Sequence, residues 1–240
     1  MKFLAAVVLV YSISSLVGVA STERKFSASQ ILKKADEVRN PGESYSMKVE
    51  VINGGTSDGS RSLFEVSVRG NDKTLIKTLE PARDRGRNML MLKEDMWAFI
   101  PNLNRAVRIS LAQKLTGQAA NGDISRMRWS GDYTATIEGE DAHHWILFLT
   151  AEKKGLTYEK LRVWIEKGNF HPSKAEFLTL AGKPLKTALY TDYRNLAGGI
   201  RPGTIQIQDA IRQDQISSIH LKDVRIEEFP ESVFNQNALK

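Results

Sequence analysis

The sequence predicts a mainly β protein, built on one antiparallel sheet or barrel. Short segments in which apolar and polar residues alternate recur along the chain, and turns rich in glycine, asparagine and aspartate separate them. Only two stretches have the spacing of an amphipathic helix. Short strands at such regular spacing favour an antiparallel sheet or barrel.

The N-terminal segment Met1–Ala20 is typical of a cleavable signal peptide. Lys2 gives it a positive start, Phe3–Val10 is a short apolar run, and Gly18–Ala20 supplies small residues before the cleavage point. The alternative is a membrane anchor, but a membrane span needs about 20 predominantly apolar residues, and this segment is shorter and carries several hydroxyl groups. We therefore expect residues 1–20 to be removed and residues 21–240 to form a single domain.

The chain has no cysteine. This excludes disulfides, thiolate metal sites and cysteine nucleophiles. It also excludes the lipid anchor of a bacterial lipoprotein, which is carried on a cysteine after the signal peptide, because the junction here reads Ala20-Ser21-Thr22. We expect an exported, soluble, unanchored protein of the bacterial periplasm. A eukaryotic secretory route is the alternative, although cysteine-free secreted domains of this size are less expected there.

The charge of the mature chain is mildly basic. Removal of Lys2 reduces the 34 basic residues to 33, against 28 acidic ones, and leaves a net charge of +5. This charge is compatible with transient contact with anionic lipid headgroups or acidic partners. It is too small and too dispersed to indicate binding to nucleic acid.

The first element of the mature chain is an amphipathic helix over Ser27–Arg39. Apolar residues lie at helical spacing between charged ones, and Ser27 or Ser29 can cap the first turn. Asn40-Pro41-Gly42 then ends the helix, because proline disfavours helical backbone in the residue before it. The apolar stripe of this helix must pack on another element.

The strands follow from Tyr45 onward, where the period changes to two. The loop Asn53–Ser60 separates the first two strands. The predicted strands are Tyr45–Val51, Phe64–Val68, Leu75–Leu79, Asn88–Leu92, Met96–Ile100, Ala106–Ile109, Thr134–Glu138, Trp145–Thr150, Tyr158–Glu166, Ser173–Leu180, Lys186–Tyr193, Gly203–Gln208 and Ile219–Ile226.

Two segments interrupt or follow this series. In Ser110–Gly117 the residues Leu111 and Leu115 are four apart, which predicts a helix inserted between strands, with a long ordered loop as the alternative. The tail Pro230–Lys240 is expected to add a short strand or to remain loose.

Motifs of catalysis and of cofactor binding are missing from the sequence. His143 and His144 are adjacent, so on a strand they point to opposite faces and cannot hold one metal ion together. The chain has no Gly-x-Ser-x-Gly motif, no phosphate loop and no dinucleotide fingerprint. We therefore expect no enzyme activity, no metal and no cofactor.

Two groups of side chains are candidates for binding. Met89, Met91, Trp97 and Phe99 crowd one short region and would form part of one wall if their strands pair. The alternative is an ordinary core filled by side chains. The basic candidates are Arg83, Arg85, Arg87, Arg105 and Arg108, with Arg126 and Arg128 farther along, and they suit phosphate or carboxylate groups. The alternative for these arginines is a solvated turn.

The stretch Arg83–Tyr133 resembles outer-membrane lipoprotein-sorting proteins of the LolA-like superfamily. The residues that carry the resemblance are Arg85-Gly86-Arg87, Met96-Trp97, Ile100-Pro101, Arg105, Arg108, Gln118, Asn121-Gly122-Asp123 and Gly131-Asp132-Tyr133. The resemblance implies an incomplete antiparallel β-barrel, or strongly curved sheet, of roughly eleven strands, with helices covering its concave face as a lid on a hydrophobic cavity.

The resemblance also implies a function in binding. Relatives carry lipids or the acyl chains of lipoproteins across the periplasm toward the outer membrane, often from an inner-membrane ABC-type transporter, and they use no cofactor. Membership would make this chain a monomeric carrier. Its cavity or lid would be lined by Met89, Met91, Trp97, Phe99, Leu111 and Leu115, and partners or headgroups would contact Arg83, Arg85, Arg87, Arg105 and Arg108.

Two other functions stay open on the sequence alone. One is a non-catalytic envelope assembly protein with a filled core, whose arginine-rich loops bind a protein partner. The other is an enzyme that modifies envelope lipids or glycans, which would need a convergent polar cluster in a cleft.

Overall fold

The computed structural model describes residues 25–54 and 60–239. The predicted signal peptide lies outside the described residues.

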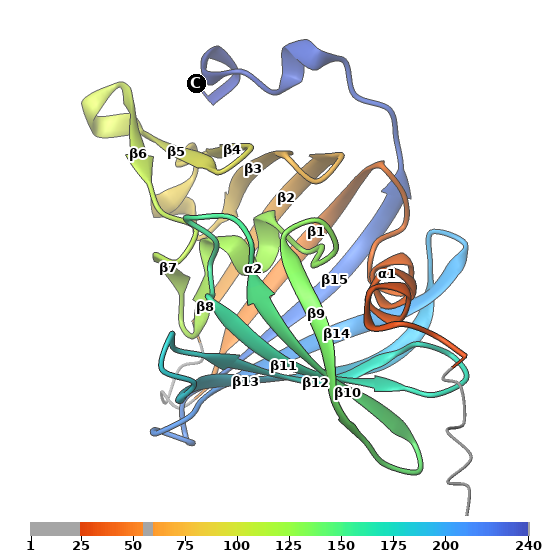
Figure 1. Cartoon of the computed structure of the whole chain (residues 1–240). Helices are drawn as coiled ribbons and strands as arrows, with labels where there is room; N and C mark the ends of the chain where they lie inside the picture. Colours follow the sequence, from red (N-terminus) through yellow and green to blue (C-terminus); the bar gives the residue numbers. More distant parts are fainter. Residues whose placement is uncertain (1–24, 55–59, 240) are drawn as a thin grey trace, which may run out of the picture.

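One antiparallel sheet of 13 strands dominates the described part of the chain, in the order β6-β5-β4-β3-β2-β1-β15-β14-β13-β12-β11-β10-β9. The strands are β1 (Ser44–Asn53), β2 (Arg61–Arg69), β3 (Lys73–Glu80), β4 (Met89–Leu92), β5 (Asp95–Ile100), β6 (Arg105–Ile109), β9 (Tyr133–Glu140), β10 (His144–Ala151), β11 (Lys160–Glu166), β12 (Pro172–Leu178), β13 (Pro184–Leu196), β14 (Gly199–Asp209) and β15 (Ile216–Ile226). Figure 1 shows the sheet bending, so that β11–β13 lie across the direction of β1–β6. Because β6 and β9 are its two edges, the sheet is open, as the resemblance implies. The resemblance implied roughly eleven strands, and the sheet has 13.

Each predicted strand overlaps one strand of this sheet, because alternation marks the face that is buried. In β1, the side chains of Tyr45, Met47, Val49 and Val51 are all buried, while Lys48 on the other face is only half-buried. Glu50 is the exception: it is buried on that other face and is held there by ion pairs with Arg61 and Lys222, each at 2.5 Å.

The helix α1 (Ala28–Arg39) matches the predicted one. Ser27 caps it: its hydroxyl accepts a hydrogen bond from the backbone N–H of Gln30, and the Gln30 side chain accepts one from the backbone N–H of Ser27. Ile31 and Ala35 are fully buried in the same apolar cluster as the strands. The helix packs on β9 and β14.

The predicted helix over Ser110–Gly117 is wrong. The segment begins with a turn in which the backbone N–H of Gln113 donates to Ser110, and β7 (Lys114–Thr116) then pairs with β8 (Ala119–Ala120) as a hairpin. The helix of this region is α2 (Asn121–Ser125), one short turn later. Leu111 lies in the turn and Leu115 lies in the hairpin. Their four-residue spacing therefore does not reflect a shared helical face.

The C-terminal prediction is also wrong, since the tail is neither a strand nor loose. Residues 230–239 form two short 3-10 turns, Glu231–Val233 and Gln236–Leu239. Phe234 and Leu239 are buried in a second, smaller apolar cluster with Leu75, Leu90 and Phe99. The tail therefore covers apolar side chains of β3, β4 and β5.

No helix in residues 25–54 and 60–239 is long and apolar enough to cross a membrane.

Candidate functional site

The four apolar candidates on β4 and β5 lie on two different faces of the sheet. They are Met89, Met91, Trp97 and Phe99. The two-residue turn between them places Met91 opposite Met96 and Met89 opposite Ala98, so these side chains share one face and lie in the large cluster. Trp97 is opposite Leu90, and both lie on the other face, with Phe99, against the C-terminal tail. The structure therefore brings the two methionines together but separates them from Trp97 and Phe99. The tight turn after Leu92 was the sequence signal for this register.

The methionine face leads into a pocket at the β6 side of the sheet, of about 140 Å³, which we call the β2–β7 pocket. We call its apolar lining residues the floor: they are Phe64, Met89, Ala98, Ile109 and Leu115. We call its charged lining residues and Gln113 the rim: they are Arg61, Arg83, Asp84, Arg87, Gln113 and Lys114. The buried polar residues Ser62, Thr78 and Asn121 also line the pocket. Leu111 does not line it and is buried in the core nearby.

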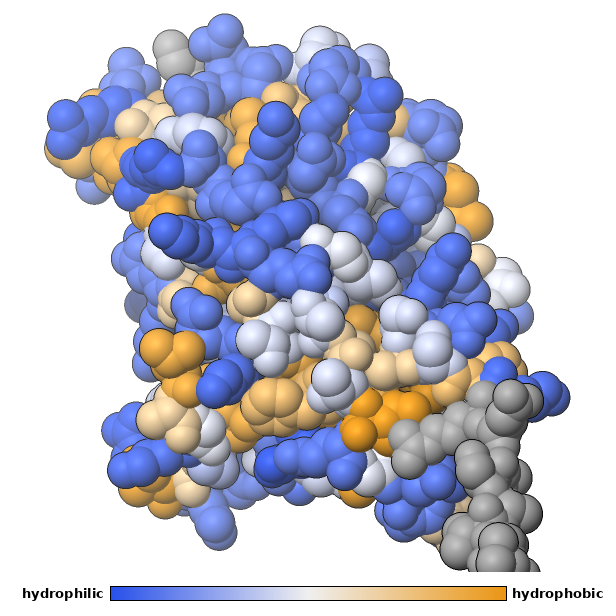
Figure 2. Space-filling view, viewed as in Figure 1, coloured by the Kyte–Doolittle hydropathy of each residue, from blue (hydrophilic) through white to orange (hydrophobic). Residues whose placement is uncertain are grey.

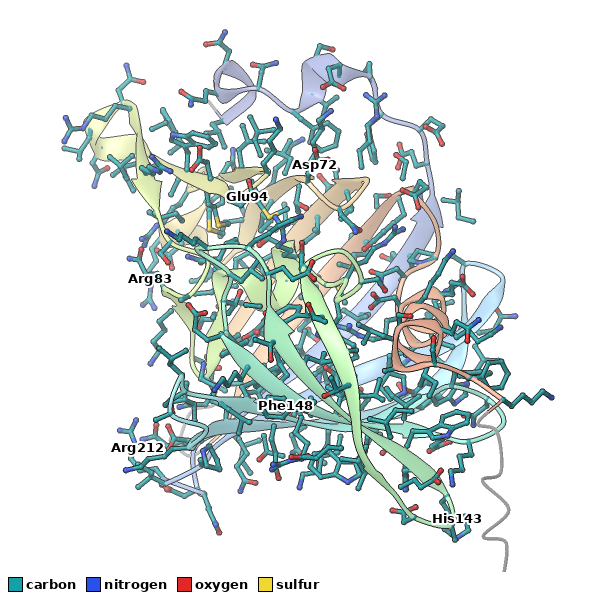
Figure 3. The ribbon with its side chains drawn as sticks, in the orientation of Figure 1. Asp72, Arg83, Glu94, His143, Phe148 and Arg212 are labelled. Atoms are coloured by element: carbon teal, nitrogen blue, oxygen red, sulfur yellow. The ribbon has the colours of Figure 1, made fainter. Side chains whose placement is uncertain are left out.

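The rim carries more positive than negative charge. Arg61 is neutralised by ion pairs with Glu50 and Glu80. Arg83 is exposed and lies next to β7 (Figure 3), and of the residues that the structure describes only its neighbour Asp84 is within ion-pair distance, at 3.6 Å. Among the described residues, the side chains of Arg87 and Lys114 make no hydrogen bond or ion pair. An apolar floor beneath unpaired cations suits a ligand with an apolar part and a negative part.

The other predicted arginines lie outside this pocket. The Arg85 side chain donates to the backbone carbonyl of Leu79, and Arg105 is exposed on β6. Arg108 is also exposed and pairs with Asp95. The remaining two, Arg126 and Arg128, are ion-paired to Asp132 and Glu43, so neither is a free headgroup contact.

Several pocket residues were not found by reasoning from the sequence. Arg61, Phe64 and Ile109 come from strands whose neighbours only the sheet order establishes, and Lys114 comes from the hairpin that the sequence mispredicted. The alternation around Phe64 indicated an inward-facing residue, but not which residues it faces.

The segment Ser110–Trp129, which we call the insert, joins the two edge strands of the open sheet. It carries β7, β8 and α2, and Figure 1 shows it between β6 and β9. Its apolar side chains Leu111, Ala119, Ile124, Met127 and Trp129 are part of the large cluster. The insert therefore fills space that the open sheet leaves between its edges.

Polar contacts attach the insert to the sheet. The Gln118 backbone N–H donates to Ser217 at 2.8 Å, the Asn53 amide donates to Thr116 at 2.9 Å, and the Thr74 hydroxyl donates to the Ser125 carbonyl at 2.7 Å.

Asp36 attaches α1 to the far end of the insert. This buried carboxylate accepts hydrogen bonds from the backbone N–H groups of Trp129 and Ser130, at 2.9 and 2.6 Å. It also forms an ion pair with Arg39, at 3.2 Å. Burial raises the pKa of Asp36, while Arg39 and the N–H donors act in the opposite direction. The guanidinium of Arg39 also lies 3.6 Å from the ring centre of Trp129. The helix and the insert are thus joined at this point.

Comparison with known structures places the chain in a family. A LolA superfamily protein from Nitrosomonas europaea has 34% sequence identity to the chain and a TM-score of 0.83, over 89% of this chain and 99% of that one. The chain belongs to the LolA superfamily. A family model described only as that of an uncharacterized protein matches residues 70–240.

Two further LolA-like folds are more distant in sequence. An outer membrane lipoprotein-sorting protein domain from Vibrio parahaemolyticus has 22% identity and a TM-score of 0.72, over 88% of this chain and 97% of that one. A DUF1329 family protein from Desulfovibrio piger has 18% identity and a TM-score of 0.76, over 89% and 98%. At these identities the likeness concerns the fold. No curated protein matches the sequence.

The interior of this LolA superfamily protein is largely filled by its own side chains. Two cavities lined by core residues of the large cluster have volumes of only about 40 and 10 Å³. Within the described ranges, no group of three His, Asp or Glu side chains is placed to hold a metal ion, and His143 lies at the tip of the β9–β10 hairpin (Figure 3).

Proposed function

We propose that the protein is a periplasmic carrier that binds lipid or lipoprotein acyl chains and moves them toward the outer membrane. The observation that carries this proposal is the β2–β7 pocket, whose apolar floor is continuous with the core cluster through Met89. Membership of the LolA superfamily and the lipoprotein-sorting name of the Vibrio relative support it. The donor would be an inner-membrane ABC-type transporter, and the carrier would act as an exported, unanchored monomer.

The pocket is too small to hold a whole acyl chain without movement. It measures about 140 Å³, whereas sites that enclose a drug-sized ligand measure roughly 300–1,000 Å³. We propose that α1 and the part of the insert after the β7–β8 hairpin, residues 121–129, cover the concave face and act as the lid. When they move away, the apolar side chains beneath them become the wall of a larger cavity.

Binding of an acyl chain would offset the free-energy cost of losing these lid contacts. Removing residues 121–129 from the sheet uncovers the apolar groups that Ile124 and Met127 now contact, and this exposure to water is unfavourable. An acyl chain that takes their place recovers about 0.8 kcal/mol for each methylene it buries. The polar contacts of residues 121–129, such as that of Ser125 with Thr74, can be exchanged for contacts with water at small net cost.

Leu115 is the residue that tests the apolar floor with least risk to folding. It is half-buried at the pocket, so Leu115→Gln is expected to weaken binding of a dodecyl chain by about tenfold, because loss of a buried leucine costs roughly 1.5–3 kcal/mol. Isothermal titration calorimetry with dodecyl maltoside, below its micelle concentration, measures this change in affinity. The matched control is Leu103→Gln, which changes an exposed leucine outside the pocket and should leave the affinity unchanged.

Native mass spectrometry of protein purified from a periplasm is the direct test. We expect a bound lipid or acyl species that Leu115→Gln reduces. Protein that carries no lipid and binds no dodecyl compound would contradict the carrier function.

A second function is favoured by the filled interior. A non-catalytic envelope assembly protein would need no cavity, and the small volumes of the core cavities fit such a role. Its basic rim would then bind an acidic face of a protein partner. Stoichiometric binding of lipid, competed by apolar probes, separates the carrier from this alternative.

A further inference from the structure

We propose that the β2–β7 pocket selects amphiphiles with a phosphate headgroup, held by Arg83, Arg87 and Lys114 over the apolar floor. The inference rests on the carrier function proposed above and adds to it the chemical class of the cargo.

The first argument is that the rim leaves cations without partners. Several basic side chains elsewhere in the described sheet pair across neighbouring strands, among them Lys48 with Asp223 at 2.8 Å and Arg162 with Glu138 at 2.5 Å. Arg87 and Lys114 have no such partner among the described residues, although both line a pocket. Among the described residues, the only carboxylate of the lining is Asp84, which lies beside Arg83. The pocket therefore has a local excess of positive charge that an anion would neutralise.

The second argument is that these cations reach the pocket from different segments. Arg83 lies in the 3-10 turn Ala82–Asp84, Arg87 lies just before β4, and Lys114 begins β7. Cations around one opening suit the several oxygens of a phosphate, whereas a planar carboxylate is matched by a single guanidinium fork.

The third argument is that the backbone beneath Arg87 is held in place while its side chain stays available. The Thr78 hydroxyl donates to the Arg87 carbonyl at 2.7 Å, and the Arg87 N–H donates to the Asp84 carbonyl at 3.0 Å. Gly86 supplies the positive φ of +83° that this turn requires. A fixed backbone reduces the entropy lost when the side chain binds an anion.

The fourth argument concerns the floor, which distinguishes an amphiphile from free phosphate. Met89, Ile109 and Leu115 line the same pocket as the rim cations. Inorganic phosphate would gain nothing from them, but an alkyl phosphate would bury its first methylenes there.

The experiment compares four compounds with the intact protein, by calorimetry below their micelle concentrations: dodecyl phosphate, dodecanoate, dodecyl maltoside and inorganic phosphate. We expect dodecyl phosphate to bind about tenfold more tightly than the other two dodecyl compounds, as hydrogen bonds to charged groups imply. Inorganic phosphate should bind far more weakly. The preference should fall between roughly 0.01 and 1 M salt, because screening shortens the Debye length from about 30 to about 3 Å.

The variant Arg87→Gln/Lys114→Gln should abolish the preference for dodecyl phosphate and leave dodecyl maltoside binding unchanged. The matched control is Arg105→Gln, because Arg105 is exposed on β6, has no side-chain partner among the described residues and does not line the pocket. Thermal unfolding followed by circular dichroism checks that the variants fold.

The outcomes separate this inference from the carrier function. Equal binding of all three dodecyl compounds overturns the phosphate preference and leaves the carrier function standing. Inorganic phosphate binding as tightly as dodecyl phosphate overturns the inference in favour of a plain phosphate site. Failure of every dodecyl compound to bind contradicts the carrier function itself.

Discussion

Replacing Asp132 by alanine is expected to lower the free energy of unfolding by about 3–5 kcal/mol, the cost of leaving a buried charge without its partner. The Asp132 carboxylate accepts two hydrogen bonds from the guanidinium of Arg126, at 2.5 and 2.7 Å. The side chains are only 1% and 4% exposed, respectively, so the guanidinium left behind is largely shielded from water, and among the described residues it keeps only the Lys93 carbonyl, at 2.5 Å, and the partly exposed Glu94, at 3.9 Å, as partners. Chemical denaturation followed by circular dichroism measures the change.

The control for this prediction is Asp95→Ala. It removes the partner of Arg108 in a pair that is 42% and 70% exposed, so the expected loss is at most about 1 kcal/mol. Equal losses for Asp132→Ala and Asp95→Ala would show that burial of the Asp132–Arg126 pair has no energetic consequence.

The same pair predicts a dependence of stability on pH. Burial alone would raise the pKa of Asp132, but hydrogen bonds from Arg126 and Lys153 outweigh it and hold the pKa below the usual 3.8. The folded protein then binds this proton less readily than the unfolded chain does. The contribution to stability is therefore complete above pH 3.8 and is lost as the pH falls through the lowered pKa. Asp132→Ala should remove this part of the acid destabilisation, and equilibrium denaturation over an acidic pH series tests it.

Replacing Gly117 by alanine is expected to lower the free energy of unfolding by about 2–5 kcal/mol, the sum of a left-handed backbone and an overpacked contact. Gly117 has a φ of +53°, which favours glycine. An added Cβ would overlap the side chains of Asn53 and Ser217, which are hydrogen-bonded to each other at 2.6 Å. The substitution would force this buried polar contact apart and loosen the insert.

The matched control is Gly131→Ala. Gly131 also has a positive φ, of +83°, but no atom lies within 4 Å of the position of an added Cβ. It therefore measures the backbone cost alone, about 1–2 kcal/mol. Thermal unfolding of the two variants tests the difference, and identical losses would mean that the contact of Gly117 with Asn53 and Ser217 is not tight.

The elements that the sequence predicted correctly are those whose signal is local. The alternation in Tyr45–Val51 determines which side chains of β1 are buried, and Ser27 with Gln30 forms a cap from residues three apart. These patterns survive in the fold because pleating and helix capping depend on nearby residues.

The errors lie where the fold brings distant residues together. Within the insert, Lys114–Thr116 is a strand of a hairpin and not part of a helix. Gly117, in the turn of this hairpin, packs on Asn53 and Ser217, which are far away in the chain. The tail after Pro230 has no strand partner, and it is ordered because Phe234 packs on the apolar face of β3–β5. The residues of the hairpin and of the tail do not themselves indicate the distant surfaces on which these two segments pack.

The candidate site shows the same division. Arg83, Arg87 and Met89 were singled out because residues of their kind cluster locally in the sequence, and Leu115 because of its place in the predicted helix. All four line one pocket, but Trp97 and Phe99 belong to the opposite face. The face of the molecule seen in Figure 2 is largely hydrophilic, with a band of apolar side chains across its lower half.

What the sequence by itself determined was the mainly β class, the place of each sheet strand along the chain and the start and end of α1, because periodicity, caps and turns act over a few residues. The tertiary structure alone decided which face of β4 and β5 looks inward, since both faces are apolar and only strand register distinguishes them. It also decided which cations remain unpaired, because pairing depends on neighbours such as Glu50 and Arg61 that strand order brings together.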